Sequence, residues 1–199
     1  LVFHTLILLD LETWLHPAGW MVGLLLLGGT LGAFWILFGR FGRPKVTGKL
    51  QSLVRYPDLR VVEGRVALEP GWPGHRPGQF AFVTTSAAEG PHPFTIASAW
   101  DPADPGLTFI MKGLGDWTDE LAEHLKEHTP VEVEGPYGHF DFADANPRQI
   151  WVGAGIGITP FVAKMKELAR EPGGPEVHLF HVTRDVDRTA LDELSADAE

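Results

Sequence analysis

The sequence contains no cysteine, which excludes disulfide bridges, thiolate metal sites and cysteine nucleophiles. It also lacks an excess of positive charge, since 16 lysines and arginines face 26 aspartates and glutamates and the formal net charge is −10. No nucleic-acid partner is expected, because no domain-wide basic surface is available to neutralise phosphates. With 199 residues, 44% of them hydrophobic, the chain suits one or two compact units.

Charge is absent altogether from one long apolar run, Pro17–Phe38. At about 1.5 Å per helical residue, the run is long enough to cross a hydrocarbon core of about 30 Å. A signal peptide has a shorter apolar region, of roughly 7–15 residues, and a buried core helix of a soluble domain has a polar face that is missing here. We therefore predict a transmembrane helix, with Trp14, Trp20 and Trp35 near its ends.

The residues on either side of this run predict its topology. The apolar residues 1–9 resemble the end of a preceding span, joined through the polar link 10–16 as an antiparallel hairpin, and we expect the chain to be part of a longer protein. Arg40, Arg43 and Lys45 follow the run directly. Because cations accumulate on the cytoplasmic side of membrane proteins, we predict a multi-pass protein with everything after about residue 45 in the cytoplasm.

The next part of the chain has the pattern of a small antiparallel barrel or sandwich. Short alternating runs are separated by Gly, Pro and Asp, and the predicted strands are 58–68, 79–86, 94–99, 107–112 and 130–134. One helix is predicted among them, over 118–128. From residue 149 the pattern changes to strand (149–154), glycine loop, helix (161–170) and strand (176–182), with a further helical stretch after it. This β-α-β order predicts a parallel sheet, which we expect to be incomplete.

Two glycine loops are candidate phosphate sites, because the free N–H groups and positive dipole of a helix start favour an anion. One is Lys112-Gly-Leu-Gly-Asp-Trp-Thr118, where the Thr118 hydroxyl can cap the helix; the alternative is an ordinary capped helix. The other is Gly153-Ala-Gly-Ile-Gly-Ile-Thr-Pro160. It misses the dinucleotide fingerprint by one residue, since Ile158 stands in the place of the third glycine, and an ordinary strand-to-helix turn is its alternative.

Several motifs occur in a fixed order: RPGQF (76–80), HPFTIAS (92–98), GDWT (115–118), GPYG (135–138) and GAGIGITP (153–160). The last four, in this order, resemble the ferredoxin–NADP reductase superfamily. With a preceding membrane span they resemble its ferric reductase and NADPH oxidase branch, of which HPFT is a hallmark. The resemblance covers essentially the whole chain. It implies the end of a transmembrane helical domain (1–44), an antiparallel β-barrel that binds FAD (45–148) and the start of an α/β, parallel-sheet domain that binds NAD(P) (149–199).

The resemblance also implies roles for individual residues. The Thr95 hydroxyl would approach the flavin N5 and is the catalytic candidate, and Phe94 would pack on the flavin. His92 stands where the superfamily commonly has arginine, which leaves less fixed positive charge for the pyrophosphate. Arg184 stands where the family contacts the ribose 2′-phosphate, which favours NADPH over NADH. The implied cofactor-binding set is His92, Pro93, Phe94, Thr95, Lys112, Gly115, Trp117, Thr118, Gly135, Gly153, Gly155, Ile156, Gly157, Thr159, Pro160 and Arg184.

The implied activity is electron transfer from NADPH through FAD and a membrane haem b to an external acceptor. The leading acceptor is ferric iron, and reduction of dioxygen to superoxide is the first alternative. The second alternative is a membrane-anchored flavin module without NADPH-driven turnover. Because the branch holds its haems with paired histidines on earlier spans, His4 is the candidate haem ligand and His16 a weaker one.

Other histidines and the tryptophans invite rival interpretations. His124-Leu-Lys-Glu-His128 matches the inverted zinc-protease signature, but no third ligand is evident and we favour a solvated charged face. His178 and His181 lie three apart on a predicted strand and therefore on opposite faces, and we predict packing roles for both. Trp72, Trp100 and Trp151 are predicted to lie in the core.

Overall fold

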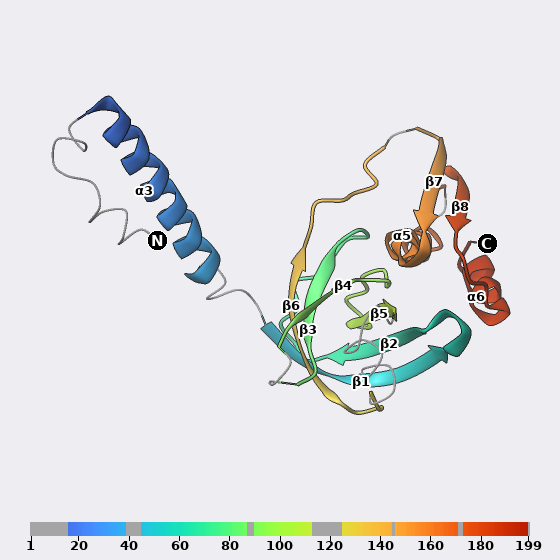
Figure 1. The fold of residues 1–199 in the computed structure, drawn as a ribbon. Coiled ribbons are helices and arrows are strands. Elements are labelled where there is room, and N and C mark those ends of the chain that lie inside the picture. Colours follow the sequence, from blue (N-terminus) through green and yellow to red (C-terminus); the bar gives the residue numbers. More distant parts are fainter. Residues whose placement is uncertain are drawn as a thin grey trace. The chain divides into compact units, whose positions relative to one another are not determined.

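The computed structural model describes residues 16–38, 45–86, 90–112, 125–144, 146–170 and 173–198 (Figure 1). They belong to two compact units, Leu1–Arg43 and Pro44–Glu199. The predicted division of the second unit at residue 148 stays a prediction.

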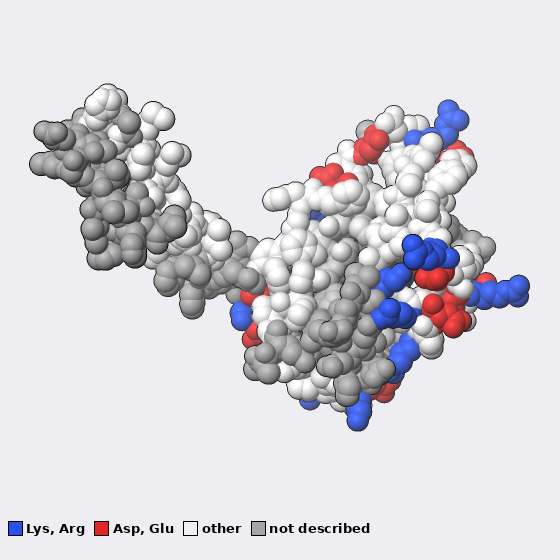
Figure 2. Space-filling model, in the orientation of Figure 1, with Lys and Arg blue, Asp and Glu red and all other residues white. Residues whose placement is uncertain are grey.

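The described part of the first unit is the helix α3, Pro17–Phe38, which confirms the predicted helix at both ends. The hydroxyl group of Thr30 is hydrogen-bonded within the helix, since its Oγ1 donates to the carbonyl of Leu26 at 2.7 Å. Most of the described large side chains of α3 are exposed, Trp35 by 74% and Leu25 by 73%, and Figure 2 shows no charged side chain on it. Among the described helices it alone is long and apolar enough to cross a membrane, over Gly19–Ile36. The preceding span, with His4, lies outside the described residues.

The second unit begins with an antiparallel barrel, which confirms the predicted architecture. Its six-stranded sheet has the order β4-β3-β6-β1-β2-β5, and a bridge between Ile96 and Phe109 joins the end of β4 to β5. The strands are β1 (Lys45–Tyr56), β2 (Val61–Leu68), β3 (Phe80–Thr84), β4 (His92–Thr95), β5 (Gly106–Lys112) and β6 (Pro130–Tyr137). Alternate residues fill the interior, among them the fully buried Ile96, Leu107, Phe109 and Val133.

Strand β1 has no counterpart in the sequence prediction, although Val46 and Leu50 alternate into the core. Two features hide it. A register shift between Leu50 and Ser52 breaks the alternation. Gly48, which discourages a strand assignment, is required by a close approach, since a Cβ there would lie 2.6 Å from the carbonyl oxygen of Ala67.

The predicted helix 118–128 is wrong at its described end. Residues 125–128 are not helical and residues 127–128 form a turn. His128 has a φ of 68° and donates its backbone N–H to the carbonyl of Leu50 at 2.7 Å. Because this N–H is bonded to a residue of β1, it cannot donate to the carbonyl four residues earlier, as a helix would require. His128 is therefore not on the helix that the zinc interpretation requires, and His124 lies outside the described residues.

The remaining elements form the predicted β-α-β arrangement. Strands β7 (Arg148–Ala154) and β8 (Glu176–Val182) are parallel. A short turn of 3₁₀ helix, η2 (Gly155–Ile158), leads into α5 (Thr159–Leu168), and α6 (Arg188–Ala198) follows β8. Trp151, Ile158, Val162 and Met165 form a second core between the strands and α5. Trp72 and Trp151 are buried and Trp100 packs against the barrel core, as predicted.

Candidate functional site

Thr95 lies at one end of a row of side chains on the outer surface of the barrel. It pairs directly with Phe80 on β3, and Phe80 pairs with Tyr137 on β6. Side chains of directly paired residues lie on the same face of a sheet, whereas Ala81, next to Phe80, is fully buried in the interior. The hydroxyl of Thr95 is thus placed beside aromatic rings rather than in the core.

Three aromatic rings make this outer surface unusual. The ring centroids of Phe80 and Phe82 lie 5.8 Å apart, and both lie within 5.6 Å of the ring of Tyr137. All three side chains are only half-buried. The Tyr137 hydroxyl donates to Glu134, a buried residue of the same strand. We call Thr95, Phe80, Phe82 and Tyr137 the aromatic row. Such a row offers an apolar aromatic surface with the Thr95 hydroxyl at one end, which suits an aromatic ligand.

Gln79 ties the aromatic row to the loops beside it. Its backbone carbonyl accepts from the N–H of Ile96 at 3.0 Å, which holds the residue after Thr95. Its side chain accepts from the N–H of Arg76 at 2.9 Å and donates to the carbonyl of Gly138 at 3.5 Å. The RPGQF turn, the HPFT strand and the GPYG loop therefore meet at this one residue.

The other predicted barrel residues have the following positions. The ring of Phe94 faces the interior and lies 6.4 Å from the ring of Phe109, while Pro93 is exposed and His92 half-buried. Gly135 precedes a cis peptide bond to Pro136, and a Cβ there would lie 3.3 Å from both Ala81 and Trp72. The close approach of these two residues explains why position 135 is a glycine.

The glycine loop between β7 and α5 has two kinds of glycine. A Cβ on Gly153 would lie 3.1 Å from the side chain of Ile158, so Gly153 permits close packing. Gly155 and Gly157 have no atom within 4 Å of such a Cβ, and Gly155 has a φ of +51°. These two leave the backbone accessible at the start of a helix, as an anionic ligand would require.

Thr159 and Pro160 close the loop at the first turn of α5. Thr159 is buried, and its hydroxyl donates to the carbonyl of Ile156 at 2.8 Å. Pro160 lies in the first turn, where its missing N–H costs no hydrogen bond. Within the described structure, then, these two residues shape the loop.

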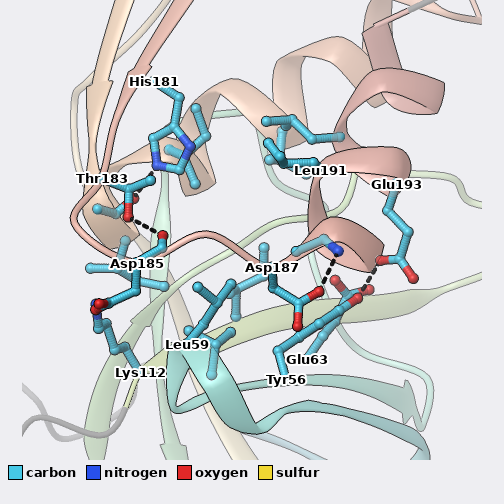
Figure 3. Close-up of a pocket in the computed structure, with 18 of the residues that line it drawn as sticks. Tyr56, Leu59, Glu63, Lys112, His181, Thr183, Asp185, Asp187, Leu191 and Glu193 are labelled. Carbon is cyan, nitrogen blue, oxygen red and sulfur yellow. Dashed lines mark hydrogen bonds between the residues drawn. The ribbon is translucent and has the colours of Figure 1, made fainter.

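A pocket of about 130 Å³ brings the end of the barrel and the glycine loop together (Figure 3). Lys112, at the end of β5, and Gly155 and Ile156 of the loop all line it. His181 and Thr183, at the end of β8, line it too. Three of the predicted residues are therefore neighbours of one cavity.

The opposite end of this pocket is acidic. Glu63, Asp187, Glu193 and Asp197 line it, and the hydroxyl of Tyr56 donates to Glu193 (Figure 3). Burial raises the pKa of Glu63, against the pull of Lys166, and burial likewise raises the pKa of Asp197. Because carboxylates repel phosphate, this end of the pocket does not suit a phosphorylated group.

Arg184 is exposed in the turn after β8. Its neighbours Thr183 and Asp185 line the pocket, and Thr183 Oγ1 donates to the carbonyl of Asp185 at 2.9 Å. Arg184 itself does not line the pocket, although both of its sequence neighbours do. Figure 2 shows positive and negative side chains interspersed over the visible face of this unit.

Four predicted site residues lie outside the described part of the chain: Gly115, Trp117, Thr118 and His4. Among the described residues, no group of three or more histidines and acids could hold a metal ion. Sequence reasoning missed Phe82, Tyr137 and the pocket contact of His181. One signal was available, because the run Phe80-Ala-Phe-Val83 is apolar on both faces of its strand, which indicates that its outer face is covered too.

Comparison with known proteins agrees with these features. Residues 61–141 match a family model described as an FAD-binding domain. The chain is similar to ferric reduction oxidase 5 of Arabidopsis thaliana, with 37% identity over 81 residues. It is also similar to NADPH oxidase 1 of Rattus norvegicus, with 36% identity over 103 residues. These matches cover 39% and 46% of this chain, but only 12% and 17% of the relatives.

The fold is similar to that of a solved reductase. A cytochrome P450 reductase from Amycolatopsis superposes with a TM-score of 0.62 at 23% identity, over 77% of this chain and 49% of that one. The barrel, the β-α-β unit after it and the sequence matches agree: residues 61–141 form an FAD-binding domain, and the chain is similar to ferric reductases and NADPH oxidases.

Proposed function

We propose that the chain is the flavin- and nucleotide-binding part of a membrane oxidoreductase that takes electrons from NADPH. The observation that carries the proposal is the aromatic row beside Thr95, within the match to an FAD-binding domain. The relatives named for ferric reduction and for NADPH oxidation support the reaction class.

The aromatic row fits an isoalloxazine ring. Phe80 and Tyr137 offer an apolar surface that excludes water, and the Thr95 hydroxyl lies at the edge of that surface, where it can hydrogen-bond a ring nitrogen. We assign Thr95 to the flavin N5. Pro93, which pairs with Phe82, is a further proposed flavin contact, together with His92 and with Lys112, Gly115, Trp117 and Thr118. Phe94 and Gly135 face the barrel interior and are not part of the proposed flavin surface.

The glycine loop and the turn after β8 fit a nicotinamide nucleotide. The open backbone at Gly155 and Gly157 would receive its phosphates. Arg184, which is exposed in the turn between two pocket-lining residues, would pair with a 2′-phosphate, which favours NADPH over NADH. The acidic end of the pocket would be left to the uncharged or cationic part of the ligand.

FAD, when bound, accepts a hydride and can release electrons singly. The residues of this chain bind, orient and shield rather than form bonds: Thr95 fixes the position of the ring, the aromatic row keeps water away, and the loop orients the nucleotide. The helix α3 would anchor the chain in a bilayer. Haem b in that bilayer would receive the electrons from the flavin, and His4 is our candidate haem ligand. The terminal acceptor is proposed to be ferric iron, with dioxygen as the alternative.

The experiment is to purify the intact membrane protein and record its absorption spectrum during anaerobic NADPH addition. Bleaching of the flavin followed by reduction of haem supports the proposed path. A spectrum that does not change would overturn it, and bound flavin that NADPH cannot reduce would favour a flavin module without turnover. Addition of ferric chelate or dioxygen to the reduced protein then distinguishes the acceptors.

A further inference from the structure

One polar residue interrupts an apolar series on β8. Val177, Leu179 and His181 lie on the same face of the strand, because alternate residues of a strand share a face. Val177 and Leu179 pack against the second core, next to α5. His181 is the last of the series, where the strand reaches the pocket.

His181 contacts the glycine loop directly. Its Nε2 lies 3.1 Å from the carbonyl oxygen of Gly155 (Figure 3). A carbonyl oxygen can only accept, so Nε2 carries the proton and donates it. The contact joins the end of β8 to the residue of the loop that has a φ of +51°.

The loop is held at two successive carbonyls. His181 binds the carbonyl of Gly155, and Thr159 Oγ1 binds the carbonyl of Ile156. Because a peptide unit is planar and trans, fixing a carbonyl also fixes the N–H of the next residue, which points the opposite way. The two side chains therefore set the directions of the N–H groups of Ile156 and Gly157.

We propose that His181 is a positioning residue for the nicotinamide nucleotide. By holding the carbonyl of Gly155, it keeps the loop's N–H groups oriented for phosphate before the ligand arrives. The proposal rests on the proposed function, since it concerns the same nucleotide site. It differs from a pure packing role in requiring a hydrogen-bond donor at the place of Nε2.

Substitutions of matched shape separate the two roles. In His181→Gln the amide nitrogen can reach the position of Nε2 and donate to Gly155, whereas in His181→Asn the amide is too short. His181→Phe keeps the ring and removes the donor. His178→Phe is the control, because His178 is exposed on the opposite face of the same strand.

The experiment measures NADPH affinity of the intact, FAD-loaded protein by titration calorimetry, together with hydrogen exchange of residues 153–159 without nucleotide. A net hydrogen bond is worth about 0.5–1.5 kcal/mol, so the Phe and Asn variants are expected to bind NADPH roughly 2- to 13-fold more weakly. Their loop amides should exchange faster. The Gln variant and the His178→Phe control should match the wild type in both measurements.

The outcomes are distinguishable from failure of the proposed function. Wild-type protein that does not bind NADPH overturns the proposed function, and with it the nucleotide role of His181. Wild-type binding with unchanged affinity in the Phe and Asn variants overturns the role of His181 alone. A loss of affinity shared equally by the Gln variant also overturns it, because the donor would then not matter.

Discussion

The hydroxyl of Tyr56 on β1 donates to the carboxylate of Glu193 on α6, which joins the barrel to the last described helix. Burial, followed by this hydrogen bond to Glu193, raises the pKa of Tyr56, so the phenol stays protonated over the physiological range. The contact borders the acidic end of the pocket. It contributes to holding α6 against the barrel.

Tyr56→Phe removes the donor but keeps the ring. Since hydrogen bonds to charged groups contribute about 1.5–3 kcal/mol, we expect amides of α6 to exchange with solvent roughly 10-fold faster or more, at unchanged exchange in β1. Hydrogen exchange with mass spectrometry measures this. Equal exchange in α6 of both proteins would mean that other contacts dock the helix.

Glu63→Gln is expected to stabilise the protein at pH 7. The pKa of Glu63 is raised, chiefly by burial, so the folded state favours the neutral carboxyl group. The contribution of Glu63 to the stability of the fold is therefore greatest at low pH and is lost as the pH rises through the pKa of the folded state. A neutral amide avoids the desolvation of a carboxylate. Thermal unfolding at pH 7 and pH 5 should show a gain that is larger at pH 7, and a loss at pH 7 refutes this explanation.

We expect His75 to make the fold less stable at low pH, which is the opposite of the pH dependence expected for Glu63. His75 is buried and bonds the carbonyl of Ser98 through Nε2 at 2.9 Å, while Nδ1 accepts from Trp72. Burial lowers its pKa, so the unfolded chain takes up a proton first and stability falls as pH drops below about 6.5. Urea unfolding of wild type and His75→Gln between pH 7.5 and 5.5 measures this, and the same slope in both would exclude His75 as the cause.

Gly155→Ala and Gly157→Ala form a matched pair. Both sites have room for a methyl group, but only Gly155 has a left-handed φ. We expect a cost of about 1–2 kcal/mol for Gly155→Ala and a much smaller one for Gly157→Ala, measured by chemical denaturation. If the two variants are equally stable, the conformation of the loop does not depend on glycine at 155.

Much of this structure could be predicted from sequence because the patterns are local. The helix Pro17–Phe38 has no charged residue, and the parallel unit has a clear strand, loop and helix order. Strand β1 could not be predicted, since its alternation is interrupted at Leu50 and Ser52 by a shift that only its partner β2 reveals. The end of the helix predicted over 118–128 is wrong because the N–H of His128 pairs with Leu50, which is distant in sequence.

The candidate site divides in the same way. The HPFT and glycine-loop motifs identify residues by their order along the chain, and Lys112, Gly155 and Ile156 do line one pocket. The aromatic row depends on cross-strand pairs between Thr95, Phe80 and Tyr137. The bond of His181 to Gly155 likewise depends on the parallel pairing of β7 and β8. Neither the cross-strand pairs of the aromatic row nor the bond of His181 to Gly155 can be predicted from the spacing of residues along the sequence.

Arg184→Ala tests cofactor choice. Loss of a charge-assisted contact to the 2′-phosphate, worth about 1.5–3 kcal/mol, should lower the preference for NADPH over NADH roughly 10- to 100-fold. The affinity for NADH should change little. Dissociation constants for both nucleotides measure this, and an unchanged ratio would remove Arg184 from the 2′-phosphate site.

The central claim is that Thr95 lies at the flavin N5. Rapid anaerobic mixing of FAD-loaded protein with NADPH, in wild type, Thr95→Ser and Thr95→Ala, tests it most directly. We predict that all three retain FAD, that the serine variant is reduced at close to the wild-type rate, and that the alanine variant is reduced about 10-fold more slowly or worse, as expected for one lost hydrogen bond at the reacting atom. Equal reduction rates in all three would contradict the placement of Thr95 at the flavin N5.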